Sequence, residues 1–234
     1  VRWLKKTLNQ QNIYSIFVSN SLKKNLLNKE IGFRNTPKTI YTGVNTDIFK
    51  RKKNVQLENT IFLQVSNFND KKGQEITIQA FNEHLKSSEN RTSQLVFVGD
   101  GKNITKCKEL VDSLNLKDNV LFKGAMNREQ IISEMEKSSI FVHHSLTPSN
   151  GDQEGIPNSI IEAMSMELPI LSTYHSGIPE AVENGVNGFL CQEFDIETYS
   201  KQMSAIESWN YLTINRKKVL EQFNINSHID QLKN

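Results

Sequence analysis

Short apolar runs alternate with longer helical stretches from Thr60 to Cys191, and this alternation limits the fold more than any other feature of the chain. Six apolar runs predict buried strands: Ile61–Val65, Leu95–Val98, Val120–Phe122, Ile140–Val142, Ile170–Ser172 and Phe189–Cys191. The stretches between them predict helices: Gln74–Leu85, Ile104–Leu114, Arg128–Lys137, Ser159–Met166 and Pro179–Val182. Strands rich in Val, Ile and Phe that alternate with helices indicate a parallel sheet covered on both faces. The sequence therefore predicts a doubly wound α/β domain whose ligand crevice lies at the carboxyl ends of the strands.

The two ends of the chain fall outside this pattern. At the start we expect a helix, a strand, a helix with Ser19 as its N-cap, and a second strand: Arg2–Gln10, Ile13–Val18, Ser19–Lys29 and Ile40–Gly43. From Asp195 onward we expect two helices, broken near Trp209–Tyr211. The predicted division is the end of a preceding domain (1–49), a linker (50–59), the doubly wound domain (60–194) and C-terminal helices (195–234). Because Val1 is not Met, we expect a piece of a longer chain.

Composition excludes several classes of protein. The formal net charge of +2 is too small to indicate nucleic-acid binding. The basic run Lys50–Lys53 predicts a solvated linker, with contact to an anionic membrane surface as the alternative. Cys107 and Cys191 lack metal-ligand spacing, so we expect free thiols in a reducing cytosol and no metal site. No apolar run approaches the length of a membrane span, and no signal-peptide pattern is present. We therefore expect a cytoplasmic protein, with peripheral association at the inner face of the membrane as a further expectation.

The stretch Glu154–Glu162, Glu-Gly-Ile-Pro-Asn-Ser-Ile-Ile-Glu, combines two carboxylates with the predicted start of a helix. Gly155 frees the backbone, and Pro157 suits the first helical turn. Free N–H groups at a helix start favour an anion such as phosphate, whereas carboxylates accept hydrogen bonds from sugar hydroxyls. The arrangement therefore suits a ligand with phosphate in the middle and a sugar at each end, as in a nucleotide sugar. The competing interpretation is a solvated loop residue at 154 and a surface charge at 162.

Glu154–Met164 also closely resembles the Glu-x7-Glu signature of retaining GT-B glycosyltransferases of family 4. Ser145 and the insertion Asn150–Gln153 resemble the subgroup that builds bacterial exopolysaccharides. The resemblance implies the Rossmann-like C-terminal domain of a GT-B glycosyltransferase, joined to the end of a truncated N-terminal domain. It also implies transfer of a hexose from a UDP- or GDP-linked sugar to a saccharide or lipid-linked acceptor, with no cofactor. In this family the reaction retains the configuration at the anomeric carbon.

The resemblance assigns roles to individual residues. Glu162 would accept hydrogen bonds from the ribose, and Glu154 would hold hydroxyls of the donor sugar. The Lys72 ammonium and the helix start would stabilise the departing diphosphate. We therefore expect Glu154 and Lys72 to be catalytic. The donor-binding residues expected at the helix start are Gly155, Ile156, Pro157, Asn158 and Ser159.

The other donor-binding candidates lie in loops that follow three strands: Asn67, Gly99, Gly124 and Met126. Asn67 stands where the family commonly has an Arg, so Lys71 is a candidate substitute for the missing charge. Gly99 belongs either to a ligand-lining loop or to a structural turn. The loop with Gly124 and Met126 would hold the nucleobase through backbone groups.

Two histidines, His143 and His144, end the fourth predicted strand of the domain. Adjacent strand residues point to opposite faces, so one metal ion cannot readily take both. We expect one ring to face the donor and the other to be packed. Glu180 is placed to interact with the dipole of the helix that it begins.

Two other classes of function remain open. The first is a binding module, that is, a donor-binding half or pseudoenzyme module that needs a separate acceptor domain. The second is an NAD-linked oxidoreductase or a sugar-nucleotide epimerase. Ile104 stands where a dinucleotide fingerprint has its third Gly, which argues against NAD, and the Glu-x7-Glu spacing argues against the epimerase. The expected partners are a nucleotide sugar, an acceptor and the missing N-terminal domain, without nucleic acid.

Overall fold

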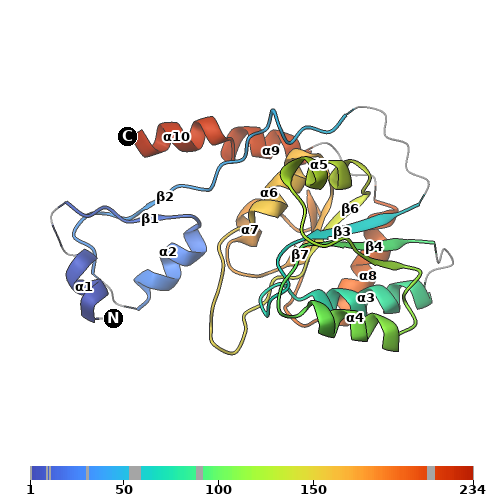
Figure 1. Cartoon of the computed structure of the whole chain (residues 1–234). Coiled ribbons are helices and arrows are strands. Elements are labelled where there is room, and N and C mark those ends of the chain that lie inside the picture. Colours follow the sequence, from blue (N-terminus) through green and yellow to red (C-terminus); the bar gives the residue numbers. More distant parts are fainter. Residues whose placement is uncertain are drawn as a thin grey trace.

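The larger part of the molecule is a six-stranded parallel sheet with helices on both faces, and an N-terminal segment (residues 2–43) projects from one side (Figure 1). The structure is a computed structural model that describes residues 2–8, 10, 12–29, 32–52, 59–87, 92–209 and 214–233. It confirms the predicted α/β fold with a doubly wound parallel sheet. Residues 53–58 of the predicted linker lie outside the described residues.

The part of the chain that forms the sheet and its covering helices, from Ile61 to Glu207, is called the sheet unit below. Its elements follow the predicted order. Its strands are β3 (Ile61–Val65), β4 (Gln94–Val98), β5 (Val120–Phe122), β6 (Ile140–His143), β7 (Ile170–Thr173) and β8 (Gly188–Cys191). The helices between them are α3 (Gln74–Ser87), α4 (Ile104–Ser113), α5 (Arg128–Glu136), α6 (Asn158–Ser165) and α7 (Ile178–Ala181). Every boundary lies within one or two residues of its predicted position.

The strand order places the ligand crevice. The strands run β5-β4-β3-β6-β7-β8, and every neighbouring pair is parallel. The order reverses between β3 and β6, where Leu63 lies opposite Phe141. In open α/β sheets the loops on either side of such a reversal part and leave a crevice at the carboxyl edge.

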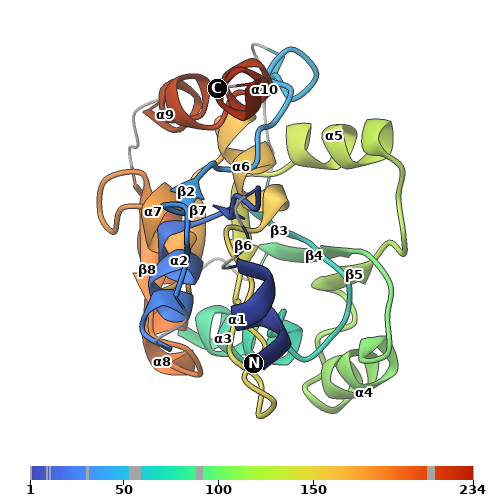
Figure 2. The ribbon, with the colours of Figure 1, turned by 90° about the vertical axis from the view of Figure 1, so that its left-hand side faces the viewer.

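Both faces of the sheet are buried, and alternate residues of a strand serve opposite faces. Phe62 packs against Phe81 of α3, with ring centroids 5.8 Å apart. Leu63 belongs to the other cluster, with Ile160 of α6. Helices α3, α4 and α8 (Ile196–Glu207) therefore cover one face, and α5, α6 and α7 cover the other (Figure 2). Burial on both faces explains why these strands are continuous apolar runs.

The N-terminal segment departs from the predictions in its strands. It contains α1 (Arg2–Leu8), β1 (Ile16–Phe17), α2 (Asn20–Leu27) and β2 (Lys38–Thr39). The predicted strand at Ile40–Gly43 is wrong, because the parallel ladder with β1 covers Lys38 and Thr39. Ile40 still donates its N–H to Phe17 O at 2.9 Å, but β1 ends at Phe17, so the ladder between the described residues stops there. Ser19 is confirmed as the N-cap of α2: its Oγ accepts the N–H of Leu22 at 3.2 Å.

Glu180 of α7 fixes this segment to the sheet unit. Its carboxylate accepts the backbone N–H groups of Asn20 and Ser21, at 2.9 and 2.8 Å, which are the first free donors of α2. Tyr41 Oη donates to the same carboxylate at 2.8 Å. Glu180 also lies in the first turn of its own helix α7, as predicted, and accepts the α2 hydrogen bonds in addition. Burial and the negative charge of Glu180, to which Tyr41 is hydrogen-bonded, raise the pKa of Tyr41 to about 12.

The described residues after Asp195 form three helices and not the predicted two. After α8 come α9 (Ile214–Gln222) and α10 (Ile225–Lys233), while residues 210–213, at the predicted break, are outside the description. The second break lies at Asn224, which pairs with Val44 in an isolated parallel bridge. Val44 donates its N–H to Phe223 O at 2.8 Å and accepts from Ile225 N at 3.0 Å. This long-range pairing coincides with the end of α9, and Asn224 Oδ1 accepts the N–H of Asn226 at 2.8 Å at the start of α10.

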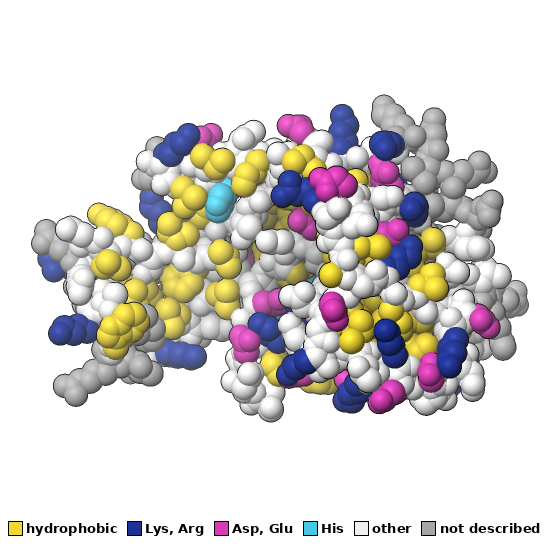
Figure 3. All heavy atoms as spheres, in the orientation of Figure 1, with side chains coloured by type: hydrophobic (Ala, Val, Ile, Leu, Met, Phe, Trp, Pro, Cys, Tyr) yellow, Lys and Arg dark blue, Asp and Glu magenta, His cyan; other side chains and the backbone are white. Residues whose placement is uncertain are grey.

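Apolar side chains gather on the surface formed by the N-terminal segment and α10 (Figure 3). Trp3 and Tyr14 are 74% and 73% exposed, and Leu232 of α10 is 51% exposed. Among the described residues no helix is long and apolar enough to cross a membrane.

Candidate donor site at the carboxyl edge of the sheet

A cavity of about 520 Å³ opens where the strand order reverses between β3 and β6. The loops that follow β3, β4, β5 and β6 form its wall, and Val18 and Thr42 of the N-terminal segment complete it. Ten of the twelve predicted site residues line it: Asn67, Lys72, Gly99, Met126, Glu154, Gly155, Ile156, Pro157, Asn158 and Ser159. Residues from four separate loops therefore converge as the sequence predicted.

The start of α6 forms one wall of this cavity. Pro157 is the N-cap, with φ −59° and ψ 127°, and the helix begins at Asn158. The prediction that Pro157 lies within the first turn is therefore off by one residue. The N–H groups of Asn158 and Ser159 belong to the first turn, where the helix itself supplies no acceptors. Both residues line the cavity, so the helix start presents partial positive charge to it.

Two glycines in the wall are required for different reasons. Gly155 does not have the positive φ that its predicted role in freeing the backbone implied. A Cβ there would lie 2.9 Å from Val18 Cγ2, so the glycine makes room for the N-terminal segment. Gly99 has φ 138°, and a Cβ would lie 2.0 Å from Ser66 O. Only glycine fits this turn after β4.

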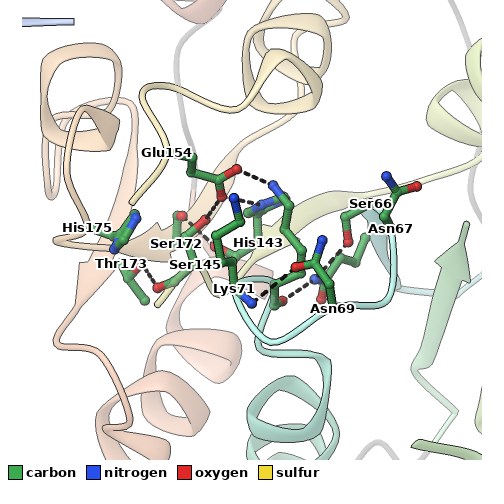
Figure 4. A network of polar contacts seen from close by, with 12 residues as sticks. Ser66, Asn67, Asn69, Lys71, His143, Ser145, Glu154, Ser172, Thr173 and His175 are labelled. Atoms are coloured by element: carbon green, nitrogen blue, oxygen red, sulfur yellow. Dashed lines mark hydrogen bonds and ion pairs between the residues drawn. The ribbon is translucent and has the colours of Figure 1, made fainter. Parts of the chain in front are cut away.

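Glu154 and Lys72 both line the cavity and are in direct contact, and Figure 4 shows Glu154 beside Ser145 and His143. The Lys72 ammonium donates to Glu154 Oε2, and the side chains are only 13% and 18% exposed, respectively. Ser145 Oγ donates to Glu154 Oε1 at 2.8 Å. The sequence predicted both residues for the site, and the structure adds that each holds the other in place.

The charge state of Glu154 follows from these contacts. Burial favours the neutral acid, but the adjacent Lys72 ammonium favours the carboxylate, and the pKa of Glu154 lies well below its usual range. Glu154 is therefore an ionised acceptor at neutral pH. The cavity thus combines a cation from the loop after β3 with an anion and a helix start that both follow β6.

The two adjacent histidines point in opposite directions, as predicted. His144 accepts the N–H of Phe194 at Nε2, 3.2 Å away, and its ring packs edge-on to Tyr199 with centroids 4.7 Å apart. Burial lowers the pKa of His144 to about 3, so this ring is neutral. His143 faces the cavity side, with Nε2 3.9 Å from Glu154 Oε1. In the part of the chain that the structure describes, no cluster of three or more potential metal ligands occurs.

Glu162 lies one turn further along α6, outside the main cavity. It lines a small adjoining cavity of about 40 Å³ with Thr42, Gly43 and Asn158. Thr42 and Asn158 line both cavities, so Glu162 is next to the main one. Burial raises the pKa of Glu162, although the charge of Arg128 opposes this shift.

Two other candidates lie beside the cavity. Gly124 is not in its wall, but Gly124 O accepts the N–H of Gly99 at 2.8 Å and so couples the loops after β4 and β5. Lys71 forms an ion pair with Asp152 at 2.8 Å, on the loop that precedes Glu154. It does not line the cavity, so the prediction that Lys71 substitutes for the family's Arg is not supported by its position.

Several lining residues were not predicted from the sequence. Val18 and Thr42 reach the cavity only because α2 and the 40–43 stretch dock on the sheet unit. No local motif marks them. Ser66 and Asp100 sit directly beside the predicted Asn67 and Gly99, and their place after a strand was a usable signal.

Known proteins are similar to this chain in sequence. The family model described as Glycosyl transferases group 1 matches residues 45–222. The putative colanic acid biosynthesis glycosyltransferase WcaL of Salmonella typhimurium is 29% identical over 168 residues, 69% of this chain and 41% of its own length. The amylovoran biosynthesis glycosyltransferase AmsK of Erwinia amylovora is 33% identical over 135 residues, 58% of this chain and 33% of its own length.

Solved structures support the same fold. HepE of Anabaena, crystallised in complex with UDP and glucose, has a TM-score of 0.83 at 21% identity, over 99% of this chain and 65% of its own. The matches to the two curated relatives named above span 41% and 33% of those proteins' own lengths. Since the family model covers more than half of its residues, the chain belongs to the glycosyl transferases group 1 family, whose GT-B fold its parallel sheet matches.

Proposed function

We propose that this chain binds a nucleoside-diphosphate sugar and serves a retaining glycosyltransferase of bacterial surface polysaccharide synthesis. The observation that carries the proposal is the Glu154–Lys72 pair beside the start of α6. It places an acceptor for sugar hydroxyls next to two sources of positive charge. A nucleotide sugar has the complementary groups side by side: the sugar hydroxyls and the negatively charged diphosphate.

The proposed binding mode follows the charges. The diphosphate lies at the first N–H groups of α6, and the Lys72 ammonium neutralises it as the sugar departs. Glu154 accepts hydrogen bonds from the sugar hydroxyls, and Glu162 accepts them from the ribose. The loop with Gly124 and Met126 holds the base. We propose that the acceptor attacks the face from which the diphosphate leaves, so that configuration is retained without a covalent enzyme intermediate.

The relatives support the class of substrate. WcaL and AmsK carry the names of two exopolysaccharides, colanic acid and amylovoran, and HepE was crystallised with UDP and glucose. We therefore propose a UDP- or GDP-linked hexose as donor, no further cofactor, and a saccharide or lipid-linked acceptor. A lipid-linked acceptor would bring the protein to the inner face of the cytoplasmic membrane.

The test is calorimetric titration of the chain with UDP, GDP and their hexose conjugates. We expect at least one conjugate to bind, and Glu154→Gln to weaken the intact donor while leaving the free nucleoside diphosphate nearly unchanged. In the proposed binding mode the Glu154 carboxylate faces the sugar and not the ribose, so only the sugar loses a charged acceptor. Equal loss for both ligands would contradict the assignment of Glu154.

A second candidate function is a donor-binding half that requires a separate acceptor-binding domain. The exposed apolar side chains of the N-terminal segment, among them Trp3 and Tyr14, favour it, because such a surface suits a covering partner. Transfer needs donor and acceptor held together in near-attack geometry. We expect this chain to bind donor and to release nucleoside diphosphate only slowly, which a coupled assay measures. Rapid transfer to a saccharide acceptor by the chain alone would contradict it.

A further inference from the structure

The imidazole of His143 is a buried polar group without a hydrogen bond. The residue is 0% exposed, and neither ring nitrogen has a hydrogen-bond partner among the described residues. Buried polar side chains in folded proteins nearly always have such a partner, so this ring calls for an explanation. A hydrophobic residue would fill the same space in β6 without leaving two polar atoms unpaired.

The ring is positioned next to the central carboxylate of the cavity. It stacks on Phe141, with centroids 6.3 Å apart and planes at 16°, and its Nε2 lies 3.9 Å from Glu154 Oε1. That separation is about 1 Å too long for a hydrogen bond. Burial lowers the pKa of His143, and the Lys72 charge adds to this effect although Glu154 opposes it. The neutral ring therefore has one N–H to donate and brings no charge.

Glu154 is held by two other donors, Ser145 on Oε1 and Lys72 on Oε2. If a diphosphate binds at the start of α6, it competes for the Lys72 ammonium. A largely buried carboxylate that loses its cation needs a replacement donor, because an under-satisfied buried charge is costly. With free nucleoside diphosphate, water can enter the space of the sugar and hydrate Glu154. An intact donor fills that space, and the replacement must come from the protein.

We propose that His143 is a positioning residue: its imidazole N–H takes over Glu154 Oε1 as the donor's diphosphate draws the Lys72 ammonium away, and so keeps the carboxylate aimed at the sugar. The inference rests on the proposed function and adds a residue to it.

The test compares UDP-glucose with UDP by calorimetry on the parent chain, His143→Phe and His143→Gln. His143→Phe keeps the ring stack on Phe141, so we expect an unchanged or higher melting temperature. Affinity for UDP-glucose should fall about tenfold, whereas affinity for UDP should change less than about twofold. His143→Gln retains an N–H donor and should recover most of the loss. The buried His84 of α3, which lines neither cavity, provides the matched control, and His84→Phe should leave both affinities unchanged.

Parent-like affinity of His143→Phe for UDP-glucose, or equal loss for UDP and UDP-glucose, would overturn the inference. If the parent chain binds none of UDP-glucose, UDP-galactose and GDP-mannose, the proposed function itself fails. This outcome differs from a failure of the His143 inference alone, in which the parent chain still binds a donor. A measurement on the parent protein keeps the test valid should the Phe variant misfold. With 15N-labelled histidine, saturating UDP-glucose should move the His143 N–H proton signal downfield and slow its exchange with water. An unchanged signal would contradict the proposal.

Discussion

The sheet unit and the N-terminal segment differ in what determines their structure. In the sheet unit the strands are short and mostly apolar, and helices cover both faces of the sheet, although Leu121 of the edge strand β5 is 37% exposed. In the segment the two strands are two residues long, and large apolar side chains such as Trp3 remain exposed. The segment keeps its place through a few contacts, with Glu180 at their centre. Local sequence pattern therefore fixes the first region, and long-range contacts fix the second.

Truncating a core ring should separate the two regions most strongly. Phe62 is fully buried and packs on Phe81, so Phe62→Ala should cost about 3–5 kcal/mol of unfolding free energy. Phe17 is half-buried against Phe33, 6.1 Å between ring centroids, and Phe17→Ala should cost about 1 kcal/mol. Urea denaturation followed by circular dichroism measures both. Similar losses would show that the segment is as well packed as the sheet.

Nucleotide binding should depend on the sheet unit. Removing the Glu162 carboxylate in Glu162→Ala should weaken nucleoside-diphosphate binding by about 1.5–3 kcal/mol, the worth of a hydrogen bond to a charged group. The exposed Glu183 provides the control, and Glu183→Ala should leave the affinity unchanged. Calorimetric titration with UDP and GDP measures the affinity of both variants. Unchanged affinity of the Glu162 variant, with clear binding by the parent, would remove Glu162 from the ribose site.

Docking of the segment should depend on Glu180. Glu180→Ala leaves the N–H groups of Asn20 and Ser21 and the hydroxyl of Tyr41 without their acceptor. We expect local opening of the segment to become easier by about 1–3 kcal/mol. Hydrogen exchange should then speed up in residues 12–43 and stay unchanged in β3 and β6. Faster exchange throughout the sheet would mean that the two regions unfold as one unit.

The same difference between the two regions explains which parts of the structure could be predicted from the sequence. The strands of the sheet unit were predictable because each is a short apolar run of its own. The site loops were predictable because each of them follows a strand. The break at Asn224 was missed: Asn is a common helix N-cap and was a usable signal, but its pairing with the distant Val44 was not visible in the sequence. The contribution of Val18 and Thr42 to the cavity was missed for the same reason. The role of Gly155 was misjudged because the sequence does not show which side chain packs against it.

The two regions should respond to opposite extremes of pH. His144 has a folded pKa of about 3 against about 6.5 unfolded, so the unfolded chain gains a proton first and sheet stability falls as pH drops from about 6.5 toward 3. Tyr41 has a folded pKa of about 12 against about 10 unfolded, so its contribution is complete below pH 10 and is lost as pH rises toward 12.

The acid effect is read from denaturation midpoints, and the alkaline effect from tyrosine absorbance together with exchange in residues 12–43. His144→Leu should flatten the acid slope, and Tyr41→Phe should abolish the alkaline one. A parent slope that persists in either variant would assign the effect to another group.

The central claim is that Glu154, Lys72 and the start of α6 form one donor site, and a crystal structure with the tightest-binding nucleotide sugar tests it most directly. We expect the diphosphate at the N–H groups of Asn158 and Ser159 with the Lys72 ammonium in contact, the sugar hydroxyls on Glu154 and the ribose toward Glu162. A nucleotide bound elsewhere on the molecule, or one bound here with its sugar turned away from Glu154, would contradict the account.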